Sequence, residues 1–337
     1  MASVLLIGSD PAFAEHDTGP GHPERAERLV AVTEGIGRSG LDDALVHLAA
    51  REASMEELER VHTPSYLDRL HRRCAEGGGR LDPDTVASAG SWRAALLAAG
   101  TGLAAIEALD AGKADAAFCA LRPPGHHAVA DRAMGFCLLN NVAVAAAALA
   151  DRGERVCVVD YDAHHGNGTQ DAFYGDARVL YVSMHEWPLF PGSGRLDETG
   201  VGDGIGTTVN FPLPAGATGD VYLAAVDEVV TPEIERFGPT WVLISAGFDA
   251  HRDDPLTGLG LTSGDFADLT ARIAAFAPRS GRLVAFLEGG YGLEGLRDSV
   301  AASLPALIGG APTRSESASN GGPGRAVVDA ARDLRGE

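Results

Sequence analysis

The fold is decided by the stretch Val156-Cys157-Val158-Val159-Asp160-Tyr161-Asp162-Ala163-His164-His165-Gly166-Asn167-Gly168. It begins as a short apolar run, which is typical of a strand buried on both faces of a parallel sheet. The composition then changes abruptly to aspartate, histidine and glycine. Side chains two residues apart in an extended chain share a face, so we expect Asp160, Asp162 and His164 to point the same way.

Carboxylate and imidazole groups at this spacing form half of a metal site. Catalytic zinc accepts both kinds of ligand, usually three from the protein, and keeps a further position for water. Gly166 and Gly168 would let the backbone turn away sharply after these side chains. The alternative is a surface loop whose Asp and His side chains only form hydrogen bonds. Further candidate ligands follow strands elsewhere in the chain, and they favour a metal site over a surface loop.

The composition is that of a globular protein with a large core. The chain has 337 residues, 45% of them hydrophobic and 22% charged. A net charge of −20 would repel phosphate backbones, which argues against nucleic acid as a partner. An acidic surface could attract a basic peptide or a polyamine, although solubility alone also accounts for such a charge. We find no signal peptide and no apolar run that predicts a membrane span.

Cysteine usage predicts a reducing compartment. The four cysteines are Cys74, Cys119, Cys137 and Cys157, and none forms a Cys-x-x-Cys pair. Cys119 and Cys157 lie in apolar runs, so we expect buried thiols and no disulfide framework. We therefore predict a cytoplasmic protein.

Apolar runs alternate with helical patterns along most of the chain. Strands are predicted at about residues 1–8, 45–48, 116–121, 156–159, 179–182, 209–213, 241–245 and 283–287. This alternation predicts an α/β fold: a mostly parallel sheet of roughly eight strands, with helices on both faces in three layers. We assign residues 1–310 to one catalytic domain. Residues 311–337 are predicted to be a polar, flexible tail with a short helix at Val327–Leu334.

Polar clusters follow four of the predicted strands directly. They are Arg122-Pro123-Pro124-Gly125-His126-His127-Ala128, the Asp160 to His164 segment, Ser245-Ala246-Gly247-Phe248-Asp249-Ala250-His251, and Leu287-Glu288-Gly289-Gly290-Tyr291. The carboxyl ends of parallel strands lie on one edge of the sheet, where ligands bind. We therefore expect the clusters to meet, which is a stronger signal than any one of them alone.

The chemistry of these side chains assigns their roles. Asp162, His164 and Asp249 are the predicted ligands of one zinc ion. The adjacent His126 and His127 suit acid–base work near an activated water. Such histidines need orienting partners, and Asp160 and Asn167 are available in the same loop.

Tyr291 is the predicted hydrogen-bond donor to a developing oxyanion. Each residue has a plainer interpretation when taken singly. Adjacent histidines are usually surface residues, Tyr291 could be a core aromatic, and Asp249 could cap a helix. The coincidence of all four clusters favours the catalytic interpretation.

These motifs resemble those of the class II histone deacetylases and the bacterial histone-deacetylase-like amidohydrolases, which have the arginase–deacetylase fold. The resemblance extends from about His16 to Leu307 and includes Gly135-Phe136-Cys137 and Asn140-Asn141. It implies that Asp160 orients His126 and that Asn167 orients His127, with His127 as the general base and acid. A tyrosine at position 291 implies an active enzyme.

The resemblance also implies a tunnel for an acyl-lysine side chain, lined by Phe136 and Phe190, whose plainer role would be core packing. Leu256 stands where relatives specific for polyamines carry a glutamate, which weakens the interpretation as a polyamine enzyme. A potassium ion is implied near the zinc loop. Its matching positions are Asp160, Asp162, His164, Ser183 and Met184. Arginases share the fold but need two manganese ions, and histidines at positions 165 and 251 leave that second set of ligands incomplete.

The sequence thus predicts a zinc-dependent amidohydrolase that removes an acetyl or other acyl group from lysine or a related amine. The predicted partner is an acylated lysine side chain or a small acylated amine, with no nucleic acid or membrane, and a homo-oligomer is compatible with the sequence. An acetylpolyamine amidohydrolase is the first alternative. A non-catalytic protein that binds acyl-lysine is the alternative of another class.

Overall fold

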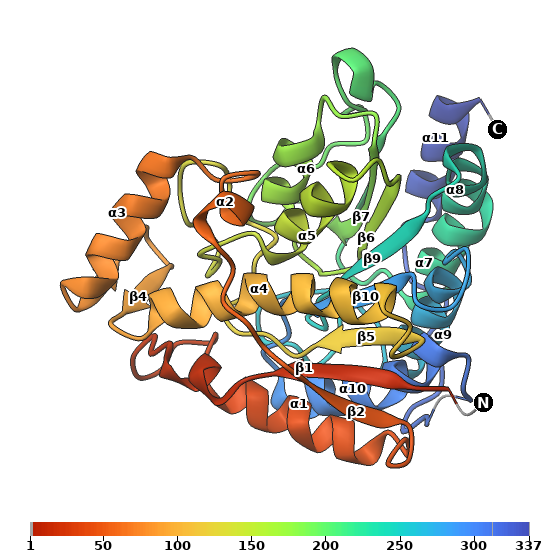
Figure 1. Ribbon diagram of the computed structural model, residues 1–337. Helices are drawn as coiled ribbons and strands as arrows, with labels where there is room; N and C mark the ends of the chain where they lie inside the picture. Colours follow the sequence, from red (N-terminus) through yellow and green to blue (C-terminus); the bar gives the residue numbers. More distant parts are fainter. Residues whose placement is uncertain (1–2, 312, 337) are drawn as a thin grey trace.

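A parallel sheet of eight strands forms the centre of the molecule (Figure 1). The computed structural model describes residues 3–311 and 313–336, so Met1 and Ala2 of the predicted first strand lie outside the described residues. The strands are β1 (Leu5–Ser9), β2 (Leu45–Ala49), β5 (Ala116–Cys119), β6 (Val156–Asp160), β7 (Val179–Glu186), β8 (Thr208–Leu213), β9 (Trp241–Ala246) and β10 (Leu283–Leu287). Their order in the sheet is β2-β1-β5-β10-β9-β6-β7-β8. Every pairing is parallel, which confirms the predicted fold class.

The apolar runs form strands because both faces of the sheet are covered. All residues of β6 are buried. Cys157 and Val159 belong to the core on one face, whereas Val156 and Val158 belong to the core on the other. A strand buried on both faces needs apolar residues at every position, which explains the absence of polar alternation in these runs.

Helices cover the two faces in separate layers. The helices are α1 (Glu27–Arg38), α2 (Met55–Leu58), α3 (Pro64–Ala75), α4 (Ser91–Asp110), α5 (Asn141–Ala150), α6 (Asn167–Phe173), α7 (Gly219–Ala225), α8 (Thr231–Phe237), α9 (Ser263–Ala274), α10 (Leu293–Ser303) and α11 (Arg325–Arg335). Short 3₁₀ segments lie at Pro11–Glu15, Gly202–Gly204 and Leu304–Ile308, and a π-helical turn at Val226–Val230 joins α7 to α8. Helices α1, α7, α9 and α10 share one core, and α4 and α5 share the other.

Helix α4 is long and apolar enough to cross a membrane, contrary to our interpretation that no such segment exists. However, 83% of its most apolar window is buried within the molecule, as expected for the core helix of a folded domain. The four cysteines are buried free thiols, which confirms the burial predicted for Cys119 and Cys157.

Glycines lie in two local features of the fold, and one of them differs from the prediction. The segment after Gly77 forms a small antiparallel pair, β3 (Gly78–Arg80) and β4 (Val86–Ser88). Gly168 belongs to α6 rather than to a sharp turn, and a Cβ atom there would collide with the carbonyl oxygen of Ala128. Gly168 is therefore required for close approach of the chain that carries His127.

The C-terminal segment, for which we predict flexibility, forms specific contacts with the domain. Glu316 forms an ion pair with His251 at 2.9 Å, and Ser319 Oγ donates to Asp265 Oδ2 at 2.5 Å. Helix α11 begins earlier than predicted and buries Val328 and Ala331. The polar residues of this segment thus form hydrogen bonds with the start of α9 and with the loop before it. The domain boundary at residue 310 stays a prediction.

Candidate active site

Four neighbouring strands bring the predicted clusters together. Strands β5, β10, β9 and β6 lie next to one another in this order, and each is followed by one cluster. Parallel strands end at a common edge, where α/β proteins bind their ligands. Across β6 and β9, Asp160 is in register with Ser245, and Ala163 N donates to Asp249 Oδ1 at 2.7 Å. The loops that carry the predicted metal ligands are therefore tied together.

Asp162, His164 and Asp249 have the geometry of a zinc site. Each offers a ligand atom, and the three atoms lie within 4.8 Å of one another. His164 Nδ1 is 2.9 Å from Asp249 Oδ2 and 3.3 Å from Asp162 Oδ1. Tetrahedral zinc with bonds of about 2.1 Å places its ligand atoms about 3.4 Å apart, so this spacing fits the ion.

The charge of this group also fits a cation. Asp162 and Asp249 are buried, and within the described residues they form ion pairs only with histidines. Burial, followed by the charge of Asp162, raises the pKa of Asp249 to about 7. Gly289 N donates to Asp162 Oδ2 at 2.8 Å, and a Cβ atom at Gly289 would collide with Asp249. The backbone thus holds two buried carboxylates together, and a divalent cation would balance their charge.

His126 has an anionic environment. Its Nδ1 donates to Asp160 Oδ2 at 3.0 Å, and Tyr181 OH donates to the same oxygen at 3.1 Å. Burial lowers the pKa of His126, but the charges of Asp162 and Asp160 outweigh burial and raise it to about 10. His126 is therefore an imidazolium at neutral pH.

His127 has the opposite environment, although its ring centroid is only 4.0 Å from that of His126. Its Nδ1 donates to the neutral amide oxygen of Asn167 at 2.9 Å. Burial, together with the positive charges of His126 and His164, holds the pKa of His127 well below its ordinary value. The two orienting pairs implied by the resemblance are both formed, and they give the two histidines different charges.

Tyr291 lies in the loop after β10. Its amide donates to Asp254 Oδ2 at 2.7 Å, and the Arg28 guanidinium lies 5.0 Å from the centre of its ring. Burial raises the pKa of Tyr291 well above its usual range, against the opposing charge of Arg28. The phenol therefore keeps its proton and can donate a hydrogen bond.

Phe136 and Phe190 form aromatic walls beside the reactive groups. The Phe136 ring contacts Tyr291 edge-on at 5.7 Å between centroids, and Phe190 contacts His127 in the same way at 5.1 Å. Phe136 has a φ of 67°, which is rare outside glycine, and its amide donates to Thr85 Oγ1. An acyl-lysine tunnel between these two rings stays a prediction.

The remaining predicted positions have indirect connections to the site. Leu256 N donates to Asp254 Oδ1 at 3.0 Å, so Leu256 is linked to Tyr291 through Asp254. Ser183 is in register with Asp160 across β6 and β7, and its hydroxyl is engaged with His185 Nδ1 at 2.9 Å. Potassium binding by this region stays a prediction. Met184 is fully buried on the same strand.

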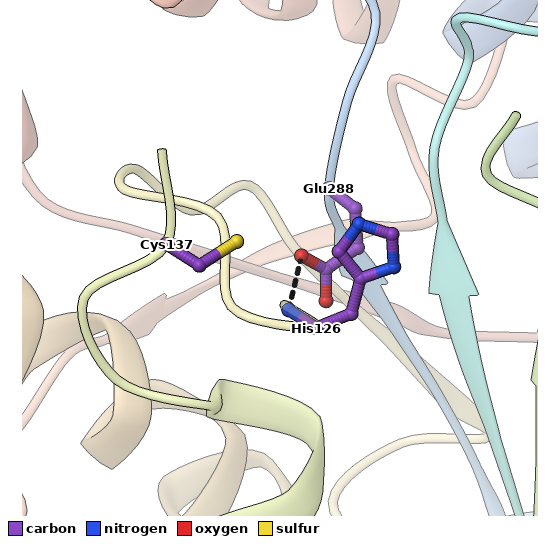
Figure 2. Close-up of side chains that lie close together, drawn as sticks. All are labelled: His126, Cys137 and Glu288. Atoms are coloured by element: carbon purple, nitrogen blue, oxygen red, sulfur yellow. Dashed lines mark hydrogen bonds between the residues drawn. The ribbon is translucent and has the colours of Figure 1, made fainter. Parts of the chain in front are cut away.

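Sequence reasoning gave no role to Asp254, Arg28 or Glu288. Asp254 anchors Tyr291, and Arg28 donates to the carbonyl oxygens of Gly290 and Glu288. Figure 2 shows Glu288 close to His126, with its carboxylate bonded to the His126 amide. Glu288 is part of the motif around Tyr291. Its role was not predictable, because a side chain that bonds to the backbone of another loop leaves no recognisable pattern in the sequence.

This chain is similar in sequence and in structure to known proteins. The family described as "Histone deacetylase domain" matches residues 22–307. A "Probable deacetylase" of Archaeoglobus fulgidus is 42% identical over 288 residues, covering 84% of this chain and 80% of the relative. A "Histone deacetylase-like amidohydrolase" of Pseudomonas aeruginosa is 42% identical over 298 residues, covering 86% and 77%.

The fold is also that of a solved relative. The crystal structure of the HDA15 HD domain superposes with a TM-score of 0.85 at 36% identity, covering 90% of this chain and 91% of the other. This similarity confirms the arginase–deacetylase fold that the motifs implied. With the site geometry and the sequence similarity, it places this chain in the histone deacetylase family.

Proposed function

We propose that the protein is a zinc-dependent deacylase that hydrolyses the amide of an N-acylated lysine or a related amine. The observation that carries this proposal is the pair of adjacent histidines, His126 bonded to the Asp160 carboxylate and His127 to the Asn167 amide, beside the group Asp162, His164 and Asp249. When bound, zinc supplies a Lewis acid for the acyl carbonyl and lowers the pKa of a water molecule. Binding of one zinc ion by these three ligands is part of the proposal.

His127 transfers the proton. Its Nδ1 is committed as a donor to Asn167, so Nε2 is the atom that accepts a proton from the attacking water. Because the pKa of His127 is depressed, the imidazole is neutral and able to accept at neutral pH. The same nitrogen returns the proton to the amine as the C–N bond breaks, which releases a carboxylate and a free amine.

His126 and Tyr291 stabilise charge instead of transferring it. The imidazolium of His126 lies beside the reacting groups and offsets the negative charge that develops there. The protonated Tyr291 phenol donates to the acyl oxygen in the transition state. Phe136 and Phe190 hold the aliphatic stem of the substrate by apolar contact.

A substrate panel tests this function. The zinc-loaded protein is incubated with acetyl-lysine peptide, longer acyl-lysines and acetylspermidine, and released carboxylate is measured. We expect turnover of an acyl-lysine peptide, with acetylspermidine poorer because Leu256 provides no carboxylate for a second amine. A preference for acetylspermidine would indicate a polyamine enzyme. Binding without hydrolysis of any substrate would contradict the proposal.

A further inference from the structure

Glu288 lies next to the chain segment that carries His126 and His127. It directly follows β10, which lies between β5 and β9, so its side chain can reach the chain that follows either neighbour. The residue is fully buried. Its Oε2 accepts hydrogen bonds from Gly125 N at 2.6 Å and His126 N at 3.1 Å, and its Oε1 accepts from Ser245 Oγ at 3.4 Å.

The two amides that donate to Glu288 lie in the bend that orients His126 and His127. Pro123 and Pro124 precede them and offer no N–H groups, so Gly125 and His126 carry the first amides of this bend. A Cβ atom at Gly125 would come within 2.5 Å of Asn141 N, so the bend is packed tightly on its opposite side. The loop is therefore fixed between α5 and the carboxylate of Glu288.

His126, Cys137 and Glu288 also lie close enough to hold a metal ion (Figure 2). His126 Nδ1 donates to Asp160, and Glu288 Oε2 already accepts two amides. Burial, followed by the charge of Glu288, raises the pKa of the Cys137 thiol well above its usual value. The protonated thiol and the occupied acceptors favour a structural role for this cluster.

We propose that Glu288 is a positioning residue that fixes His126 and His127 by accepting both amides of their bend with one carboxylate oxygen. This role rests on the proposed function, because it concerns the placement of His127 Nε2 during proton transfer. Displacement of catalytic groups by about 1 Å can lower a rate about 10²-fold. Loss of the acceptor should thus lower kcat with little change in KM, because the aromatic walls remain.

Glutamine gives a sharp test of this role. Both amides bond to the same oxygen, so the amide oxygen of Glu288→Gln can take its place, while the new NH₂ group can donate to Ser245 Oγ. We expect kcat of Glu288→Gln to stay within about threefold of wild type. Glu288→Met, with similar length and no acceptor oxygen, should lose about 10²-fold in kcat and keep its KM and zinc content.

A matched control is Asp265→Ala. Asp265 is also buried and accepts backbone amides from Thr262 and Ser319, but it lies at the start of α9. Its loss should lower the melting temperature and leave kcat unchanged. A wild-type kcat in a folded Glu288→Met variant would overturn the positioning role. A strongly reduced kcat in Glu288→Gln would also overturn it, and this second test remains if Glu288→Met does not fold.

A measurement without substrate separates this role from the proposed function. In ¹H–¹⁵N spectra, the Gly125 and His126 amide protons of wild type and Glu288→Gln should resonate at similar downfield positions. In Glu288→Met, or in Glu288→Ala if Met does not fold, both should move upfield. Unchanged amide shifts would overturn the role of Glu288, whereas an inert wild-type protein with the expected shifts would contradict only the proposed function.

Discussion

Two groups of one histidine and two carboxylates lie at different places in the molecule, and only one has the properties of a metal site. Asp162, His164 and Asp249 stand at the strand ends, while His251, Asp253 and Glu316 join the C-terminal segment to the loop before α9. In both groups, three candidate ligand atoms lie within 4.8 Å of one another. Residue type and proximity therefore do not distinguish them.

The surroundings of the two groups differ in charge and burial. Glu316 is already bonded to the Arg252 guanidinium and to Ser263 N, and the Asp253 side chain is 70% exposed. At the strand ends, both carboxylates are buried, and their ionic partners within the described part of the chain are histidines. Buried carboxylates with no Arg or Lys partner among the described residues, and with a candidate ligand, His164, as their shared partner, are what indicate a cation there.

The largest effect is expected for Asp249→Ala. Removing one of three protein ligands should abolish tight zinc binding and lower deacylation to background. Elemental analysis of the purified variant measures the zinc content, with wild type as the reference. A value near one zinc per chain would show that the ligands are assigned wrongly.

Tyr291→Phe should have the next largest effect. Loss of one donor to an oxyanion typically costs about 10²–10³-fold in kcat. Because Tyr291 is not a predicted ligand, the zinc content should stay at the wild-type value. Steady-state kinetics with an acetyl-lysine peptide measures the change, and turnover like that of wild type would remove Tyr291 from the mechanism.

Glu316→Ala should affect stability alone. The change leaves the Ser263 amide and the His251 imidazole without their acceptor, which should lower the free energy of unfolding by about 1–3 kcal/mol. Zinc content and kcat should not change. Denaturant unfolding measures the loss, and Glu316→Gln, which keeps an acceptor oxygen, should lose less. Reduced zinc binding in Glu316→Ala would assign a metal to the second group.

Asp253→Asn should have the smallest effect. The exposed carboxylate lies 3.8 Å from His251 Nδ1, and exposed substitutions usually change stability by less than about 0.5 kcal/mol. Thermal unfolding and elemental analysis should match those of wild type. A fall in zinc content would again contradict the distinction between the two groups.

The sheet and the grouping of Asp162, His164 and Asp249 at its edge could be predicted because they leave local patterns. Strands buried on both faces, such as Val156–Asp160, are continuous apolar runs, and their polar residues begin where the strand ends. Parallel topology then brings the clusters to one edge. This reasoning found Asp162, His164 and Asp249 without any knowledge of distances.

Residues that bind backbone groups could not be predicted in this way. Glu288 and Asp254 accept amides of loops that only the folded chain brings near them. For the same reason, Ser315 and Glu316 resembled a disordered tail, although they bond to Ser263 at the start of α9. Gly168 is needed for close packing, and the sequence alone does not distinguish such a glycine from one that forms a turn.

The most direct test of the zinc-dependent mechanism is a titration of the metal-free chain with Zn²⁺ while acetate release from an acetyl-lysine peptide is measured. The account predicts no release without metal and a linear rise that ends at one zinc per chain, with no rise for Asp249→Ala. Undiminished turnover by the metal-free protein, or no acetate at any zinc concentration, would contradict it.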